Sequence, residues 1–160
     1  MPQGGFGTEG GLDASGLRFA VVVARFNAHV TEPLYDGCRD ELTGNGAHPE
    51  LIETAYVPGC FELPLMAREY ASSGRFDAVI CLGAVIRGDT PHFEYVSSAT
   101  AYGVQRVGLE TATPVICGVL TVDNEQQALD RIGGSHGHKG REAALTAIEM
   151  ALAIRQSRQG

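Results

Sequence analysis

The segment FDAVICLGAVIRGDTPHFEYV, residues 76–96, gives the strongest strand signal of the chain and then changes character at once. Residues 76–86 are almost continuously apolar, which is typical of a strand covered on both faces of a sheet. From residue 93 onward, apolar or threonine side chains recur at three- and four-residue spacing, which predicts an amphipathic helix. Between the two lie Arg87, Gly88, Asp89, Thr90, Pro91 and His92.

Strand and helix signals alternate on both sides of this segment. Further strands are predicted over residues 18–25, 50–57 and 113–121, and further helices over 32–44, 61–73, 123–131 and 139–156. This alternation predicts an α/β fold, a three-layer sandwich in which a four-stranded parallel sheet has helices on both faces. Thr31 is the expected N-cap of the first helix, with Pro33 in its first turn, and Asp123 or Asn124 that of helix 123–131. Residues 132–138 are predicted to form a loop.

Length and charge limit the classes of protein that fit the chain. Its 160 residues predict a single domain over 16–160, preceded by a flexible glycine-rich arm over 1–15. A formal net charge of −7 argues against a non-specific nucleic-acid binder, whose affinity depends on neutralised phosphates. No apolar run approaches the roughly 20 residues of a membrane span, and the N-terminus lacks the regions of a secretory signal. A cytoplasmic protein that binds neither nucleic acid nor membrane is therefore expected.

Cysteines and histidines do not indicate a metal or a cofactor. Cys38, Cys60, Cys81 and Cys117 form no C-x-x-C pair and lie in or beside apolar stretches, so buried free thiols are predicted. A single H-x-H within residues 132–138 is weak evidence for metal, because solvated loops often contain histidine.

Three segments are predicted to meet at one edge of the sheet. Ligands of open parallel sheets bind beyond the carboxyl ends of the strands. Phe26 and Asn27 follow the first predicted strand, residues 58–62 follow the second, and residues 87–92 follow the third. This edge is therefore the predicted binding site.

The residues after the third predicted strand have the composition of an anion site. Thr90 before Pro91 predicts a hydroxyl N-cap and a proline in the first helical position. The amides of Gly88 and Asp89 would then face a phosphate, provided that the Asp89 carboxylate points away. His92 suits proton transfer, because free imidazole titrates at about pH 6.5. The alternative is an ordinary loop-to-helix junction with a surface histidine, and the Arg-Gly-Asp adhesion tripeptide is a chance match.

Segment 83–96, GAVIRGDTPHFEYV, closely resembles the signature of the lumazine synthase family (6,7-dimethyl-8-ribityllumazine synthase) of riboflavin biosynthesis. The resemblance covers nearly the whole chain after the arm, through ARFN (24–27), VPGCFELP (57–64), GVLTVDNEQQALDR (118–131) and HKGREAALTAIEMA (138–151). It implies a flavodoxin-like sandwich and a transferase without cofactor. The implied reaction condenses 5-amino-6-(D-ribitylamino)uracil with L-3,4-dihydroxy-2-butanone 4-phosphate to 6,7-dimethyl-8-ribityllumazine, phosphate and water.

The resemblance also implies the roles of individual residues. His92 transfers protons and Arg131 binds the phosphate of the butanone, and these two are the implied catalytic residues. Phe26 stacks on the pyrimidine and Glu62 binds ribityl hydroxyls. The remaining implied positions are Asn27, Cys60, Phe61, Ala84, Val85, Ile86 and Cys117 for the pyrimidine and ribityl groups, and Gly88, Asp89, Thr90 and Lys139 for the phosphate.

Several of these residues also have a plainer structural explanation. Without the family, Phe26 would be taken as a core residue, Glu62 as an acid complementing a helix dipole, and Arg131 as a cation at a helix C-terminus. Lys139 could equally be a solvated loop residue. Arg87 recurs in the family motif and is read as structural. Cys117 departs from the phenylalanine or asparagine common in the family, which leaves room beside the pyrimidine.

The family assembles as pentamers whose active sites are shared between neighbours. Phe26, Glu62 and His92 would come from one subunit, and Cys117 and Arg131, with Lys139, from the next. The short segment 132–140 resembles members that pack their pentamers into a hollow shell. A homo-oligomeric 60-subunit icosahedral capsid is therefore favoured over a free pentamer or decamer, with riboflavin synthase as a candidate partner inside it.

Other classes of protein share parts of this pattern. A flavodoxin-type electron carrier needs a hydroxyl-rich loop after the first strand, where this chain has ARFNAHVTE (24–32). A receiver domain needs an acidic pocket where Arg25 and Arg87 stand, and a dinucleotide enzyme needs G-x-G-x-x-G after its first strand. A non-catalytic flavin- or lumazine-binding relative, or a structural cage, is the remaining alternative. Turnover with both substrates distinguishes it from the enzyme.

Overall fold

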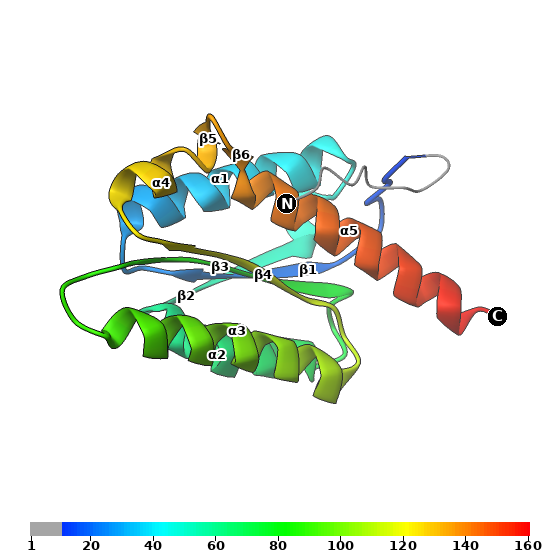
Figure 1. Cartoon of the computed structure of the whole chain (residues 1–160). Coiled ribbons are helices and arrows are strands. Elements are labelled where there is room, and N and C mark those ends of the chain that lie inside the picture. The colour runs from blue at the N-terminus through cyan, green and yellow to red at the C-terminus, as the bar shows by residue number, and fades with distance from the viewer. Residues whose placement is uncertain (1–10) are drawn as a thin grey trace.

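The computed structural model describes residues 11–160 and has three layers (Figure 1). The middle layer is a parallel sheet in the strand order β2-β1-β3-β4. Its strands are β1 (Phe19–Ala24), β2 (Ile52–Val57), β3 (Ala78–Ile86) and β4 (Val115–Val122). On one face lie α1 (Ala28–Gly44), α4 (Glu125–Leu129) and α5 (Lys139–Arg158), and on the other α2 (Leu63–Ala71) and α3 (His92–Thr111). The predicted three-layer α/β sandwich is confirmed.

Alternate residues of the central strands point into two separate cores. Phe19, Val21 and Val23 of β1 pack in the core beneath α1 and α5, whereas Ala20, Val22 and Ala24 pack in the core beneath α2 and α3. β3 is buried along its length up to Ile86, which explains why its sequence is apolar without alternation. Removal of this apolar surface from water is the main stabilisation of the sheet, at roughly 25 cal/mol per Å².

The parallel ladders continue past the strands and fix the carboxyl edge of the sheet. The amide of Arg25 donates to the carbonyl of Val57 at 2.8 Å, and that of Phe26 to Pro58 at 3.0 Å. On the other side, the amide of Arg87 donates to the carbonyl of Val122 at 2.9 Å. The backbone that follows β1, β2 and β3 is therefore held at the edge where the functional residues were predicted.

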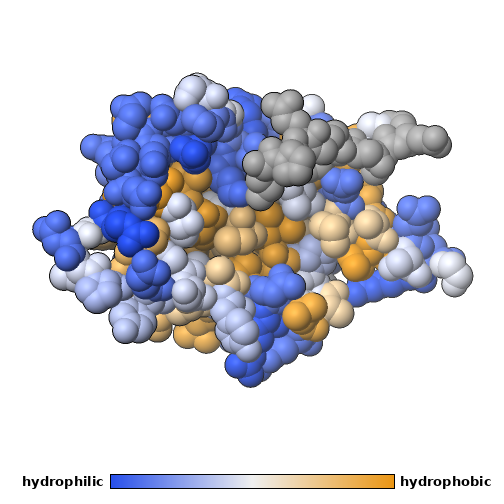
Figure 2. Space-filling view, viewed as in Figure 1, coloured by the Kyte–Doolittle hydropathy of each residue, from blue (hydrophilic) through white to orange (hydrophobic). Residues whose placement is uncertain are grey.

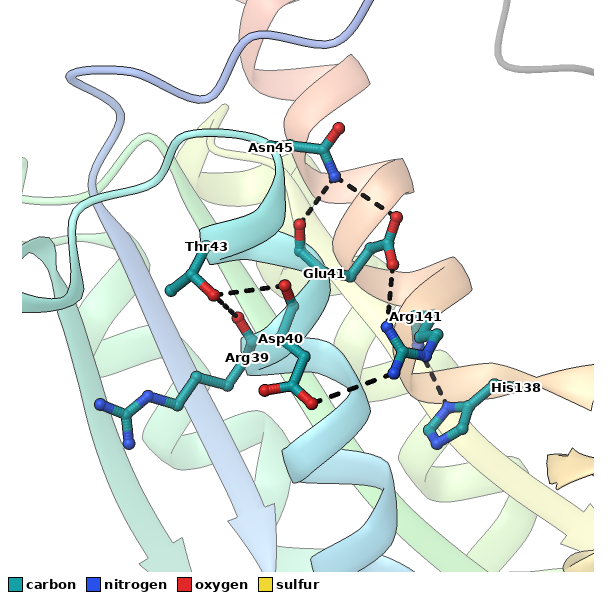
Figure 3. Close-up of polar contacts among 7 residues, drawn as sticks. All are labelled: Arg39, Asp40, Glu41, Thr43, Asn45, His138 and Arg141. Atoms are coloured by element: carbon teal, nitrogen blue, oxygen red, sulfur yellow. Dashed lines mark hydrogen bonds and ion pairs between the residues drawn. The ribbon is translucent and has the colours of Figure 1, made fainter.

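Close packing of α1 against α5 holds the upper layer together. Gly37 of α1 faces the ring of His138, and a side chain at Gly37 would collide with that ring. Figure 3 shows Arg141 of α5 between two carboxylates of α1: its guanidinium lies 3.1 Å from Glu41 and 3.9 Å from Asp40. The Nδ1 atom of His138 accepts a hydrogen bond from the Arg141 amide at 3.3 Å and so caps α5.

The starts of two helices differ from the prediction. Helix α1 begins at Ala28, so Thr31 is not its N-cap and Pro33 lies inside the helix rather than in its first turn. Asn27 takes the cap position in the left-handed conformation, with φ 64°, which asparagine tolerates better than most residues. Its carbonyl accepts the amides of Val30 and Thr31 at 2.9 and 3.0 Å.

Helix α3 begins one residue later than predicted. His92 is its first residue and Pro91 its N-cap, so Thr90 is not the cap. The Thr90 hydroxyl accepts from the His92 amide at 3.5 Å, the long limit for a hydrogen bond. By contrast, Asn124 caps α4, because its side chain accepts a 2.9 Å hydrogen bond from the Gln127 amide. Of the two predicted caps, Asp123 and Asn124, the second is therefore confirmed.

The segment predicted as a loop, residues 132–138, is a small antiparallel hairpin. Its strands are β5 (Ile132–Gly134) and β6 (Gly137–His138). Gly133 and Gly137 have φ values of 102° and 78°, a conformation that favours glycine. Two short turns, η1 (Pro49–Leu51) and η2 (Cys60–Glu62), complete the described elements.

All four cysteines are free, and three of them are buried as predicted. Cys117 is exposed, so the prediction of a buried thiol is wrong there; it lies on β4, which is an edge strand of the sheet. At the N-terminal end, Ala14 is fully buried and its amide bonds to the Asn45 carbonyl at 2.9 Å, so this part of the predicted arm is anchored. Residues 1–10 of that arm lie outside the described residues. Within the described chain, no helix has the length and apolar character of a membrane span.

Candidate functional site

A cavity of about 170 Å³ opens at the carboxyl edge of the sheet, between the ends of β1 and β3 and the start of α3. Its lining residues are Phe26, Asn27, Cys60, Ala84, Val85, Ile86, Gly88, Thr90, His92, Phe93 and Val96. Complete small-molecule sites usually measure about 300–1,000 Å³. This cavity is smaller than that, and its size suits a flat ring or a small polar group.

The end of β1 supplies an exposed aromatic ring and a bridging amide. The Phe26 side chain is 72% exposed, so it is not a core residue and its face is available to a ligand. The Asn27 side chain turns inward, and its Nδ2 atom donates to the carbonyl of Ala84 at 3.0 Å. This bond joins the ends of β1 and β3 across the floor of the cavity.

The end of β3 and the η2 turn form the apolar wall. A side chain at Gly83 would collide with the Cys60 sulfur, so the absence of one lets the η2 turn lie directly against the strand. Burial raises the pKa of the Cys60 thiol to about 12, so the group stays protonated and is no nucleophile at neutral pH. Thr100 of α3 holds this turn through a 3.1 Å bond to the Cys60 carbonyl.

The segment from Gly88 to His92 forms the polar wall. Gly88, Thr90 and His92 line the cavity, whereas Asp89 is exposed and does not line it. The first amides of α3 lack helical partners and carry the positive end of the helix dipole. Because α3 starts at His92, the donors at the helix start belong to His92 and Phe93 rather than to Gly88 and Asp89.

Several residues implied by the family pattern do not line this cavity. Phe61 and Glu62 lie beside it on η2, where Glu62 accepts a 3.1 Å hydrogen bond from the Gly59 amide through Oε2. Cys117 lies on β4, opposite Cys81 of β3. Arg131 and Lys139 are joined to each other by the 2.8 Å bond from the Lys139 amide to the Arg131 carbonyl. The Arg131 guanidinium donates to the Gln127 carbonyl at 2.8 Å through Nη1.

Two lining residues were not singled out by the sequence. Phe93 and Val96 belong to the apolar stripe of the predicted amphipathic helix, and both are partly buried. Their position in the first turns after His92 is the signal that could have identified them, because a helix start at a binding edge turns its first inward residues toward the ligand.

Two further hollows lie at the opposite, amino edge of the sheet. They measure about 500 and 230 Å³ and are lined in part by Arg68, Glu110, Arg155 and Arg158. The Arg158 guanidinium donates to the carbonyl of Ala112, at the end of α3, at 2.9 Å. These arginines complement the negative ends of helices, so the larger volume there does not by itself indicate a ligand.

Within residues 11–160, no group of three or more histidine, cysteine or carboxylate side chains is arranged to hold a metal ion.

The family model described as 6,7-dimethyl-8-ribityllumazine synthase matches residues 16–155, which include every described strand and every lining residue of the cavity.

Proposed function

The chain belongs to the 6,7-dimethyl-8-ribityllumazine synthase family, transferases of riboflavin biosynthesis, and on this premise we propose its substrates and the roles of its residues. The proposed substrates are 5-amino-6-(D-ribitylamino)uracil and L-3,4-dihydroxy-2-butanone 4-phosphate. One observation carries the proposal: all lining residues of the cavity come from segments 24–27, 57–64 and 83–96, which are far apart in the sequence and carry the family motifs.

The pyrimidine occupies the apolar part of the cavity. The exposed ring of Phe26 stacks on it, while the backbone of residues 84–86 reads its polar edge. Asn27 supports this arrangement by holding the carbonyl of Ala84. Glu62, with the backbone of Cys60 and Phe61 beside it, binds the ribityl hydroxyls through the carboxylate oxygen that does not accept from Gly59.

The second substrate occupies the polar wall. Its phosphate is bound by amides around the start of α3, with Gly88 permitting close approach and the Thr90 hydroxyl adding a donor. The amine of the uracil forms an imine with the ketone and releases water, phosphate is then eliminated, and ring closure releases a second water. His92 transfers the protons of these steps, and the proximity of the two substrates supplies much of the acceleration.

The remaining implied residues act on the site of a neighbouring subunit. Cys117, Arg131 and Lys139 would complete the neighbour's cavity in a pentamer, with Arg131 on the phosphate and Lys139 near it. The small volume of the single-chain cavity supports a shared site. Exposed apolar surface also supports assembly. Figure 2 shows such surface across the middle of the face in view. Among the large hydrophobic side chains, five that are each more than half exposed are Phe61, Leu65, Tyr95, Tyr102 and Leu109. A 60-subunit shell in the cytoplasm, able to enclose riboflavin synthase, is the proposed form.

Turnover tests the reaction, and mixed subunits test the shared site. Purified protein with both substrates should form the lumazine, followed by its absorbance. An assembled protein without turnover would instead favour a structural cage. At butanone phosphate concentrations well below the KM of Arg131→Ala, Phe26→Ala and Arg131→Ala should each be nearly inactive, and co-assembly of the two variants in equal amounts should restore about a quarter of the sites. Absence of restoration would contradict a site built from two subunits.

A further inference from the structure

Arg87 connects three elements at the mouth of the cavity. Its amide forms the last rung between β3 and β4. Its guanidinium contacts Asp123 just after β4, with Nε 2.9 Å from Oδ1, and Glu94 in the first turn of α3, with Nη1 3.0 Å from Oε1. The guanidinium carbon also lies 4.3 Å from the centre of the Phe93 ring, which lines the cavity.

The segment enclosed by these contacts is weakly held by its own bonds. Within the described chain, residues 88–91 are joined to α3 by the long Thr90–His92 contact of 3.5 Å and by the bond from the Glu94 amide to the Pro91 carbonyl, 3.0 Å. The Arg87–Glu94 ion pair joins the two ends of the segment and restricts the backbone conformations that residues 88–91 can adopt.

We propose that Arg87 is a positioning residue that holds residues 88–92 so that the first amides of α3 and the His92 ring face the cavity. It does so without touching substrate. Only a planar guanidinium can bond to two carboxylates and lie on an aromatic ring at once, so lysine cannot fully replace it. Both ion pairs are exposed, and such pairs add little to global stability. Their removal should therefore loosen the loop and leave the sheet folded.

A first test measures the loop directly and needs no substrate. Arg87→Met is compared with Arg75→Met, because Arg75 makes the same kinds of contact at the other end of the sheet: it lies 3.0 Å from Glu53 and 4.7 Å from the Phe76 ring centre. Hydrogen exchange in peptides covering residues 88–97 should be at least about tenfold faster in Arg87→Met and unchanged in Arg75→Met. Unchanged exchange in Arg87→Met, or equal acceleration in β1 and β3, would overturn the proposal.

A second test measures activity and rests on the proposed function. Arg87→Met should lower kcat/KM about ten- to a hundredfold, since small displacements of catalytic groups have effects of this size, and Arg87→Lys should recover part of the loss. Adding Glu94→Gln to Arg87→Met should change little, because the pair is already broken. Wild-type activity in Arg87→Met would overturn the positioning role. A wild-type protein without turnover would refute the proposed function, and the exchange measurement would still decide the role of Arg87.

Discussion

The side-chain amide of Asn27 donates a hydrogen bond to the backbone carbonyl of Ala84 at 3.0 Å and joins the ends of β1 and β3 beneath the cavity. The same residue stands in the left-handed conformation and caps α1. A single asparagine therefore sets the direction of the first helix and the shape of the cavity floor.

Replacing Asn27 should separate these two effects. Asn27→Ala loses the bond, about 0.5–1.5 kcal/mol, and adds the strain of a left-handed alanine, about 1–2 kcal/mol. Asn27→Gly loses the bond only, so it should be the more stable variant by about 1 kcal/mol. Urea unfolding at one fixed protein concentration measures the difference. Equal losses in the two variants would contradict the conformational part of the explanation.

Gly83 should not tolerate even one methyl group. A side chain there would collide with the Cys60 sulfur and press on Ala24 and Leu63, each at 3.3 Å, so Gly83→Ala should destabilise the fold by about 1–3 kcal/mol. Adding Cys60→Ala removes the sulfur and should recover part of the stability. Thermal unfolding of the single and double variants measures this coupling. A loss of stability in the double variant that exceeds the summed losses of the two single variants would refute it.

Stability should decrease on mild acidification because of His138. Burial between α1 and α5 lowers the pKa of this histidine, and the charge of Arg141 adds to the effect, against weaker opposing contributions from Glu142 and the Pro33 carbonyl. The unfolded chain then takes up the proton first, so stability is complete above about pH 6.5 and falls as the pH drops toward the folded pKa. Protonation would also remove the acceptor at Nδ1, where the neutral ring accepts a hydrogen bond from the Arg141 amide. Figure 3 shows this bond and the ion pairs of the Arg141 guanidinium with Asp40 and Glu41.

Two asparagine variants isolate this effect. His138→Asn keeps a side-chain acceptor for the helix cap and should flatten the dependence of the melting temperature on pH between about 5 and 7. His136→Asn, at the exposed tip of the hairpin, should leave the dependence in place. If both variants keep the slope of the wild type, His138 is not its source.

Arg131→Ala should weaken the phosphate-bearing substrate selectively. Loss of a charged hydrogen-bond donor should raise the KM for the butanone phosphate about ten- to a hundredfold and change the KM for the uracil little. Arg155→Ala removes an arginine that pairs with Asp77 at 3.4 Å at the opposite edge and serves as the control. Equal losses for both substrates would contradict the role given to Arg131.

His92→Ala should slow turnover only moderately, by about a hundredfold, because both substrates remain oriented in the cavity. The pH–rate profile should lose the limb that belongs to the imidazole. A profile with the same shape as that of the wild type would show that His92 is not the proton-transfer group.

The sequence predicted the layers of the fold because burial imposes clear patterns on it. The apolar run of β3 and the spaced stripe of α3 are consequences of a sheet covered on both faces. The helix caps were less predictable, since the position of Asn27 depends on a bond to Ala84, 57 residues away. The exposure of Cys117 was not predictable either, because strand order places β4 at the edge and local sequence does not encode that order.

The candidate site was predictable only in part, for a similar reason. Strand ends locate the edge, and the helix start locates the amides that are proposed to bind the phosphate. Phe93 and Val96 look like core residues in the sequence, and only the packing of α3 against the end of β3 turns them toward the cavity. Arg131 does not line this cavity and donates to the Gln127 carbonyl, so its position within one chain does not indicate a ligand.

A crystal structure of the protein soaked with the ribitylaminouracil substrate and inorganic phosphate tests the proposed site most directly. The pyrimidine ring should stack on Phe26, and the phosphate should lie at the start of α3, beside Gly88 and His92. A vacant cavity with either molecule bound at the amino edge near Arg158, or a His92 ring turned away from the bound phosphate and pyrimidine, would contradict it.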